Sequence, residues 1–117
     1  MKKTSVKKLL SLCKESAENK KASEVAVLDL KNLPTFTDYF LICSAQSEPQ
    51  IKAIVQEIER AVWEHTGRKA YGLEGTPASH WMILDYGELM IHVFHEKARK
   101  FYQLEQLWND APVVKTN

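Results

Sequence analysis

The sequence has few cysteines and no long hydrophobic run. Only Cys13 and Cys43 occur among its 117 residues, and neither has a second cysteine at metal-ligand spacing. No apolar stretch approaches the ~20 residues that a membrane-spanning helix requires. The lysine-rich start lacks the apolar block of a signal peptide and, unlike an organellar transit peptide, contains no arginine before Arg60. We therefore expect a cytoplasmic protein with buried, reduced cysteines.

Residue patterns of nucleotide and metal chemistry are also missing. The sequence has no glycine-rich phosphate loop and no Asp-x-Asp pair, which would place two carboxylates on the same side of one strand. A magnesium-dependent, nucleotide-handling enzyme would have to use Asp29, Asp38 and Asp85, each near the end of a predicted strand. Such an enzyme is the alternative function. Because aspartate is common in turns, we expect these three residues simply to begin or end strands.

The histidines and nucleophiles have no specific spacing either. His92 and His95 would point to opposite faces of an extended strand, so a zinc site with His80 is not expected. We expect His92 to be buried and hydrogen-bonded, and His80 and His95 to be exposed. Cys43 or Ser44 would need a histidine base, and no spacing indicates one. The sequence therefore predicts a protein that is not an enzyme and holds no metal or cofactor.

Charge is unevenly distributed along the chain. Residues 1–21 contain seven lysines and two glutamates, which leaves the remaining residues with a net charge of −4. A nucleic-acid-binding surface needs a basic stripe that releases counterions from phosphates. The mildly acidic main body therefore predicts little or no direct contact with RNA. The lysine-rich start is typical of the solvated face of a helix.

Two segments have the i, i+3, i+4, i+7 apolar spacing of amphipathic helices. The first covers residues 6–17, and the second runs from Ser47 to Gly67, which have the residue types of an N-cap and a C-cap. Trp63 lies beside the buried stripe of the second helix. A third helix is predicted at residues 96–108.

Predicted strands occupy residues 24–30, 37–44 and 68–74, and a hairpin occupies residues 80–94. The first three segments are bounded by turn residues, and the first two are rich in β-branched or aromatic side chains. A short connection that contains Pro34 favours antiparallel pairing of the first two strands. Together with the helices, this order predicts an α/β fold, a single compact domain with a mixed sheet of about five strands flanked by helices.

The hairpin consists of two short apolar runs separated by residues 85–88, Asp-Tyr-Gly-Glu. Gly87 supplies the positive φ that a tight reversal needs. Because neither arm alternates cleanly between apolar and polar residues, we expect both strands to be covered on both faces. Tyr86 at the tip is expected to be exposed.

Exposed aromatic side chains next to polar groups are typical of the energetic centres of protein interfaces. Tyr86, Trp81 and the edge formed by Arg99 and Tyr102 would lie on one side of the domain in such an arrangement. The alternative, in which these rings fold back over the core, is equally compatible with the residue types. A third possibility is a plain dimerisation module whose self-contact includes Trp63.

Several motifs are spread through the chain in order: Asp38-Tyr39-Phe40-Leu41-Ile42, Ser47-Glu48-Pro49-Gln50, Glu74-Gly75, Trp81-x-x-x-Asp85-Tyr86-Gly87-Glu88, His92-Val93-Phe94, and Arg99-x-x-Tyr102-x-Leu104-Glu105-x-Leu107-Trp108. Over about residues 5–110, the chain closely resembles the ribosomal silencing factor family, also called Iojap-related proteins. It departs from the family in small ways. The family commonly has Asp where Glu88 stands and Gly at or near Ser44–Ala45.

The resemblance implies a compact α/β fold similar to nucleotidyltransferases but without their catalytic carboxylates. It also implies a non-enzymatic translation repressor of the bacterial cytoplasm, which binds the large ribosomal subunit through ribosomal protein L-fourteen. Occupying that surface blocks joining of the small subunit and silences translation in stationary phase or starvation. Family members are often homodimers when free. The implied domain covers residues 1–110, followed by a flexible tail at 111–117.

The resemblance further implies a partner-binding surface on the hairpin and the last helix. The residues to which this role carries over are Trp81, Leu84, Asp85, Tyr86, Glu96, Arg99 and Tyr102. We expect Tyr86 and Trp81 to provide an apolar anchor. We expect Asp85 and Arg99 to provide charge complementarity and orientation.

Overall fold

The computed structural model describes the backbone of residues 5–102 and the side chains of residues 5–99. Its elements are α1 (Val6–Asn19), β1 (Ser23–Asp29), β2 (Tyr39–Ala45), α2 (Glu48–Thr66), β3 (Gly72–Thr76), the 3-10 turn η1 (Pro77–Ser79), β4 (Trp81–Asp85), β5 (Leu89–His95) and α3 (Glu96–Tyr102). The predicted order of helices and strands is confirmed. The expected continuation of the last helix to Trp108, and the tail at 111–117, lie outside the described residues. None of the described helices is long and apolar enough to cross a membrane.

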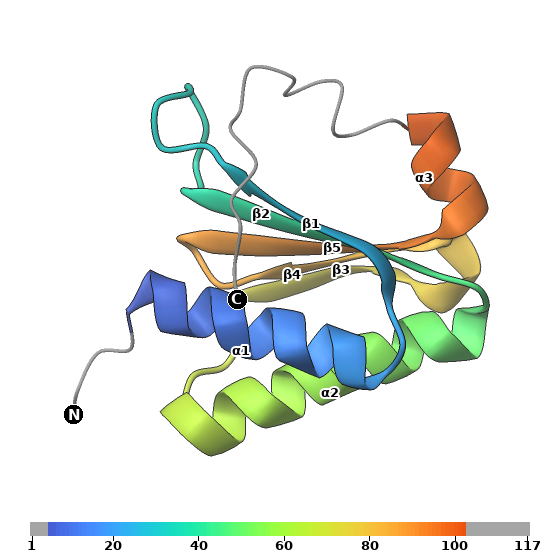
Figure 1. Ribbon diagram of the computed structural model, residues 1–117, viewed down its shortest axis with the longest axis horizontal. Helices are drawn as coiled ribbons and strands as arrows, with labels where there is room; N and C mark the ends of the chain where they lie inside the picture. Colours follow the sequence, from blue (N-terminus) through green and yellow to red (C-terminus); the bar gives the residue numbers. More distant parts are fainter. Residues whose placement is uncertain (1–4, 103–117) are drawn as a thin grey trace.

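The five strands form one mixed sheet in the order β1-β2-β5-β4-β3. β2 and β5 are parallel, and the other neighbouring pairs are antiparallel, including the predicted β1–β2 pair and the β4–β5 hairpin. Figure 1 shows α1 and α2 packed together on one face of the sheet, and α3 at one end of the opposite face. We call the face covered by α1 and α2 the inner face, and the opposite one the outer face.

The inner face is a continuous apolar core. The predicted helix stripes are confirmed, and the buried residues are Leu9, Leu10, Cys13, Ser16 and Ala17 of α1 and Ile51, Ile54, Val55, Ile58, Ala61 and Val62 of α2. They pack against strand residues such as Leu41, Leu84 and Ile91. Both cysteines are buried as predicted, and burial raises the pKa of each thiol to about 12. Because each buried aliphatic side chain contributes roughly 1.5–3 kcal/mol, this core dominates the stability.

A side chain caps the start of α2, and a backbone turn caps its end. Ser47 accepts a hydrogen bond from the backbone N–H of Gln50, as predicted for an N-cap. Gly67 ends the helix with φ 72°, in the left-handed region that favours glycine. The Gln50 side chain does not complete a capping box. Its amide instead donates to the carbonyls of Lys20 and Lys21, which joins the end of α1 to the start of α2.

Strand β3 begins at Gly72 rather than at Arg68 and continues to Thr76, into a segment predicted as a loop. The Arg68 side chain explains the later start, because it turns toward the hairpin tip. Its guanidinium donates to the Tyr86 carbonyl at 2.8 Å and pairs with Glu88 at 2.7 Å. The residues after α2 therefore bridge the helix to the sheet before pairing with β4 begins.

The two arms of the confirmed hairpin differ in burial. Most of β5 is buried, whereas β4 alternates, with Met82 and Leu84 buried and Trp81, Ile83 and Asp85 partly exposed. α3 packs mainly against β2 and β5. The prediction that both arms are covered on both faces is therefore wrong for β4.

Candidate protein-binding face

The outer face of β4 and β5 presents side chains that a partner protein can contact. Strand side chains alternate between the two faces of a sheet, so one set from each strand points away from α1 and α2. The six residues that we call the hairpin face pair across the two strands, Trp81 with Phe94, Ile83 with His92, and Asp85 with Met90. α3 begins directly after β5, at one end of this face.

Aromatic contacts hold the part of the hairpin face that lies next to the start of α3. The Trp81 and Phe94 rings are stacked, with centroids 4.8 Å apart and planes inclined by 26°. His92 lies edge-on to Phe40 of the neighbouring β2, with ring centroids 4.5 Å apart. Aromatic pairs of this kind contribute about 0.5–1.5 kcal/mol beyond the area they bury. The indole is therefore fixed in orientation although part of it remains exposed.

His92 is buried and hydrogen-bonded, as predicted. Trp81 Nε1 donates to His92 Nδ1 at 3.1 Å, and because an indole N–H is only a donor, Nδ1 must accept. Burial lowers the pKa of His92 to about 4, so the ring is neutral at pH 7 and carries its proton on Nε2. Nε2 is itself buried and has no hydrogen-bond partner among the described residues. A buried donor without an acceptor costs roughly 1–3 kcal/mol.

The part of the hairpin face nearest the turn combines apolar surface with a carboxylate. Ile83 and Met90 are partly exposed, as Trp81 is. Asp85 Oδ1 accepts a hydrogen bond from the backbone N–H of Gly87 at 2.7 Å, which fixes the carboxylate at the edge of the apolar area. An apolar centre with a charged margin is the arrangement found in protein–protein interfaces.

The expected exposure of Tyr86 is wrong. Tyr86 is 1% exposed and its ring lies in the inner core, where burial raises the pKa of its hydroxyl. The reason is strand parity, since Tyr86 continues the inner-face series of Met82 and Leu84 and its N–H donates to the Leu89 carbonyl. Leu84, another expected contact residue, is 0% exposed on the same face.

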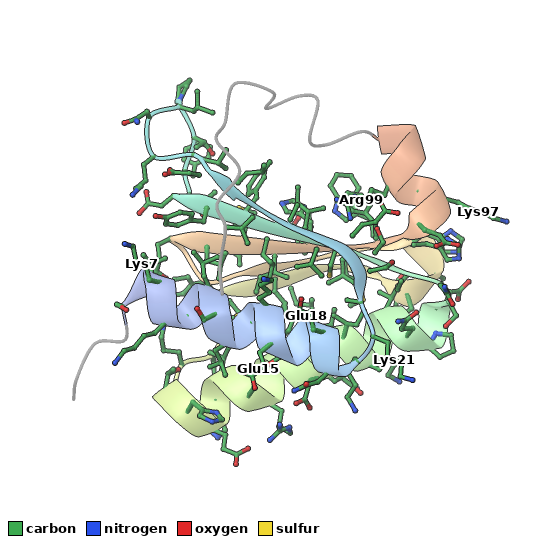
Figure 2. All side chains as sticks on the ribbon, in the orientation of Figure 1. Lys7, Glu15, Glu18, Lys21, Lys97 and Arg99 are labelled. Carbon is green, nitrogen blue, oxygen red and sulfur yellow. The ribbon has the colours of Figure 1, made fainter. Side chains whose placement is uncertain are left out.

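Arg99 is likewise buried rather than part of a solvated helix edge. It is 7% exposed, and its guanidinium donates to Ser44 Oγ at 2.9 Å and to the backbone carbonyl of Glu24. Figure 2 shows Arg99 directed toward the sheet and Lys97 directed away from the domain. Arg99 therefore fixes α3 on the end of the sheet. Glu96, at the start of the helix, is partly exposed as a contact residue should be.

Tyr102 ends α3, but its side chain lies outside the described residues. Its expected place beside Arg99 and Glu96 is therefore left as a prediction. The histidine pair near the start of α3 is half-buried rather than exposed, with the His80 and His95 rings 4.8 Å apart. His80 Nε2 lies 3.3 Å from a carboxylate oxygen of Glu48.

The three aspartates of the alternative enzyme do not converge. β2 and β5 separate β1 from β4, so Asp29 and Asp85 are three strand spacings apart, roughly 14 Å. Asp29 instead accepts a hydrogen bond from the N–H of Lys31 and lies 3.8 Å from its ammonium group. Asp38 lies in the β1–β2 connection, one residue before β2. Among residues 5–102, no three His, Cys, Asp or Glu side chains are placed to hold a metal ion.

Besides the buried His92 and Phe94, sequence reasoning missed the two partly exposed apolar residues of the hairpin face, Ile83 and Met90. They are apolar and sit within apolar runs, so no local signal separates them from core residues. The parity of the strand would have found them, because Ile83 shares its face with Trp81, and Met90 shares its face with His92. The same parity places Tyr86 inside.

Comparison with known proteins identifies relatives over almost the whole chain. The family model described as "Ribosomal silencing factor during starvation" matches residues 3–117. A ribosomal silencing factor of Halalkalibacterium halodurans is 40% identical over 106 residues, which cover 91% of this chain and 90% of the relative. The ribosomal silencing factor of Bacillus subtilis is 36% identical over 108 residues, covering 92% of this chain and 91% of the relative.

The fold is also found in a solved structure. A crystal structure of a protein from Bacillus halodurans superposes with a TM-score of 0.80 at 37% identity, covering 92% of this chain and 97% of that chain. The named relatives are regulators of translation rather than enzymes, which agrees with the dispersed aspartates. The chain therefore belongs to the ribosomal silencing factor family.

Proposed function

We propose that this protein binds the large ribosomal subunit through ribosomal protein L-fourteen and thereby prevents the small subunit from joining. The observation that carries the proposal is the hairpin face, where Trp81, Ile83 and Met90 are partly exposed beside the carboxylate of Asp85. Membership of the ribosomal silencing factor family supports the ribosome as the partner. The aromatic and apolar composition supports a protein rather than RNA as the direct contact.

The contact residues divide into two groups by burial. Trp81 is the anchor, and Asp85 and Glu96 orient the partner from the margins. Ile83 and Met90 also belong to the residues that contact the partner, and we expect Tyr102 of α3 to belong to them as well. Three residues that were expected to touch the partner are buried and instead support the hairpin and α3 from inside the domain. They are Leu84, Tyr86 and Arg99.

The mechanism is exclusion by volume and requires no bond to be made or broken. A 13.5 kDa chain seated on the joining surface of the large subunit leaves no room for the small subunit. Silencing then depends on the fraction of large subunits occupied, which is set by the dissociation constant and the concentration of the protein. The rigid pairing of Trp81 with Phe94 and His92 favours this occupancy, because little side-chain freedom is lost on binding.

The test is a subunit-joining experiment. Purified small and large subunits are mixed with increasing amounts of the protein, and joined ribosomes are separated from free subunits on sucrose gradients. We expect the protein to sediment with free large subunits and to reduce joined ribosomes in proportion to its occupancy. Unchanged joining when every large subunit carries the protein would contradict the steric mechanism.

The identity of the contact needs its own measurement. Isolated L-fourteen should bind the protein directly, and large subunits reconstituted without L-fourteen should bind it much more weakly. If both kinds of large subunit bound equally, the ribosome would remain the partner but L-fourteen would be excluded as the contact.

We propose in addition that the free protein is a homodimer. Gel filtration over a concentration series will show a concentration-dependent shift from one chain to two if this is correct. If the dimer contact includes the hairpin face, added L-fourteen will dissociate the dimer by mass action. An elution volume of a single chain at every concentration would contradict the dimer.

A further inference from the structure

The edge strand β3 and the end of α2 border an open cavity, which none of the exposed residues of the hairpin face lines. It has a volume of about 620 Å³ and is lined from α2, from the connection after it and from β3, among others by Trp63, Arg68, Lys69 and Leu73. Trp63 and Leu73 are 54% and 46% exposed, and the adjacent Tyr71 is 77% exposed. Large apolar side chains gathered at one exposed place mark an interaction surface.

The cations at this cavity are already engaged within the domain. Arg68 pairs with Glu88, and Arg60 pairs with two glutamates of its own helix. Lys69 lies over the ring of Trp63, 5.2 Å from the centroid. A phosphate or carboxylate ligand would have to break these contacts. The cavity therefore favours an apolar group, packed against Trp63 and the aliphatic stems of the cations.

Strand β3 also has an open edge of backbone hydrogen-bonding groups. It pairs with β4, and residues 73–76 are exposed. In an antiparallel pair, every second residue directs its N–H and C=O away from the partner strand. β3 therefore presents donors and acceptors to which another strand can bind, and no second strand occupies this edge among the described residues.

The register of β3 specifies what an added strand would place on each face. Leu73 pairs with Leu84, whose side chain is on the inner face, whereas Glu74 pairs with Ile83 on the outer face. A residue opposite Leu73 therefore projects toward the cavity and Trp63, and the next residue projects outward beside Glu74. A large apolar residue suits the first position. Lysine or arginine suits the second, because Glu74 is an exposed carboxylate.

We propose that the β3 edge binds an extended segment of another protein as a sixth strand of the sheet. A large apolar side chain of the bound segment enters the cavity, and a lysine or arginine next to that residue pairs with Glu74. In such strand addition, main-chain hydrogen bonds provide affinity and alternate side chains provide specificity. A second copy of β3 fits less well, because antiparallel pairing would bring two Glu74 carboxylates onto the same face of adjacent strands.

The test measures binding of a fluorescein-labelled peptide, Thr-Val-Lys-Phe-Lys-Val-Thr, to the full chain by fluorescence anisotropy. We expect saturable binding with the phenylalanine opposite Leu73. The matched control is the same peptide with N-methyl groups on the phenylalanine and both valines, which removes the N–H donors aimed at β3. It should bind at least about tenfold more weakly. Absence of saturable binding, or equal binding of the methylated peptide, overturns the proposal.

Variants of the protein separate this site from the ribosome-binding face. Trp63→Ala should weaken peptide binding about tenfold, and Glu74→Lys should transfer the preference to a peptide with glutamates in place of lysines. Trp81→Ala should leave peptide binding unchanged, so failure here and failure of ribosome binding are distinguishable. A change of the dimer population in Trp63→Ala with unaltered peptide affinity would overturn the proposal in favour of a contact between copies of the chain.

Discussion

The inner and outer faces of the sheet are built on different principles. On the inner face, apolar side chains of β1, β2, β4 and β5 meet two amphipathic helices, and almost every residue of this core is fully buried. On the outer face, a shorter helix is fixed by Arg99, aromatic rings are held by a histidine, and β4 is left partly exposed. The inner face carries the larger core, whereas the outer face combines a smaller buried cluster with the partly exposed side chains of β4.

Tyr86 and Trp81 show this difference most clearly. Both are aromatic residues of the same hairpin, Trp81 at the start of β4 and Tyr86 directly after its end, and residue type alone suggests the same role for both. Side chains alternate between the two faces along a strand, and Trp81 and Tyr86 are an odd number of residues apart, so they lie on opposite faces. Tyr86 is therefore 1% exposed in the core, while Trp81 is partly exposed. The role of an aromatic residue at a hairpin follows from its face rather than from its type.

The largest expected effect is on the inner face. Tyr86→Ala should lower the free energy of unfolding by about 3–5 kcal/mol, because it removes a buried ring from the core. Trp81→Ala should lower it by only about 1–2 kcal/mol, through the lost stacking and hydrogen bond. Urea denaturation of both variants measures this. If Trp81→Ala were the more destabilising variant, the assignment of the two rings to opposite faces would be wrong.

The second prediction concerns acid stability and His92 on the outer face. Its pKa is about 4 in the folded chain and about 6.5 when unfolded, so between these values the unfolded chain binds more protons. The free energy of unfolding should therefore fall by up to about 3 kcal/mol as the pH decreases from 6.5 to 4, and His92 should add no pH dependence above this window.

His92→Gln is the matched control for this pH dependence. Glutamine keeps an oxygen that can accept the hydrogen bond from Trp81, but it does not titrate between pH 4 and 6.5. Urea denaturation at several pH values should show that the difference between the two proteins shrinks as the pH falls. An identical acid slope in both proteins would exclude His92 as its source.

The third prediction tests how α3 is fixed on the outer face. Arg99→Ala should reduce stability by about 1–3 kcal/mol, because the Glu24 carbonyl and Ser44 lose a charged donor. Arg99→Lys should recover part of this loss, since an ammonium retains the charge but lacks the planar fork. Lys97→Ala, on the exposed side of the same helix, should have little effect. Equal losses at both positions would contradict the buried role of Arg99.

The smallest effect on stability is expected at the hairpin turn, which fixes how β4 pairs with β5. Gly87 has φ 86°, and an added Cβ would lie 2.9 Å from Cε2 of Tyr71. Gly67 has φ 72° with nothing within 4 Å of such a Cβ, so Gly67→Ala isolates the backbone strain, about 1 kcal/mol. Gly87→Ala should cost somewhat more, about 1–2 kcal/mol. Equal thermal shifts in the two variants would mean that Tyr71 moves away freely.

Much of the fold could be predicted because its signals are local. The stripes of α1 and α2, the Ser47 and Gly67 caps and the hairpin turn at Gly87 depend on neighbouring residues, and they are found where expected. The start of β3 could not be predicted, because it depends on the distant pairing of Arg68 with Glu88. The role of Gln50, which joins α1 to α2, is equally non-local.

The candidate site could be predicted only in part, for the same reason. Trp81 and Asp85 are partly exposed on the expected strand, whereas Tyr86 and Arg99 are buried. Residue type and the family resemblance together identified all four as candidate contact residues. Whether each side chain points to solvent depends on strand parity and on the packing of α3, which requires the three-dimensional arrangement.

The most direct test of the hairpin face as the ribosome-binding surface compares the partly exposed Trp81 with the exposed Trp63. Large subunits are sedimented with increasing concentrations of Trp81→Ala or Trp63→Ala, and the bound fraction gives the dissociation constant. We predict that Trp81→Ala loses ~2 kcal/mol or more of binding, roughly thirtyfold in affinity, while folded Trp63→Ala, altered on α2, binds like the unaltered protein. Undiminished binding by folded Trp81→Ala would contradict the account.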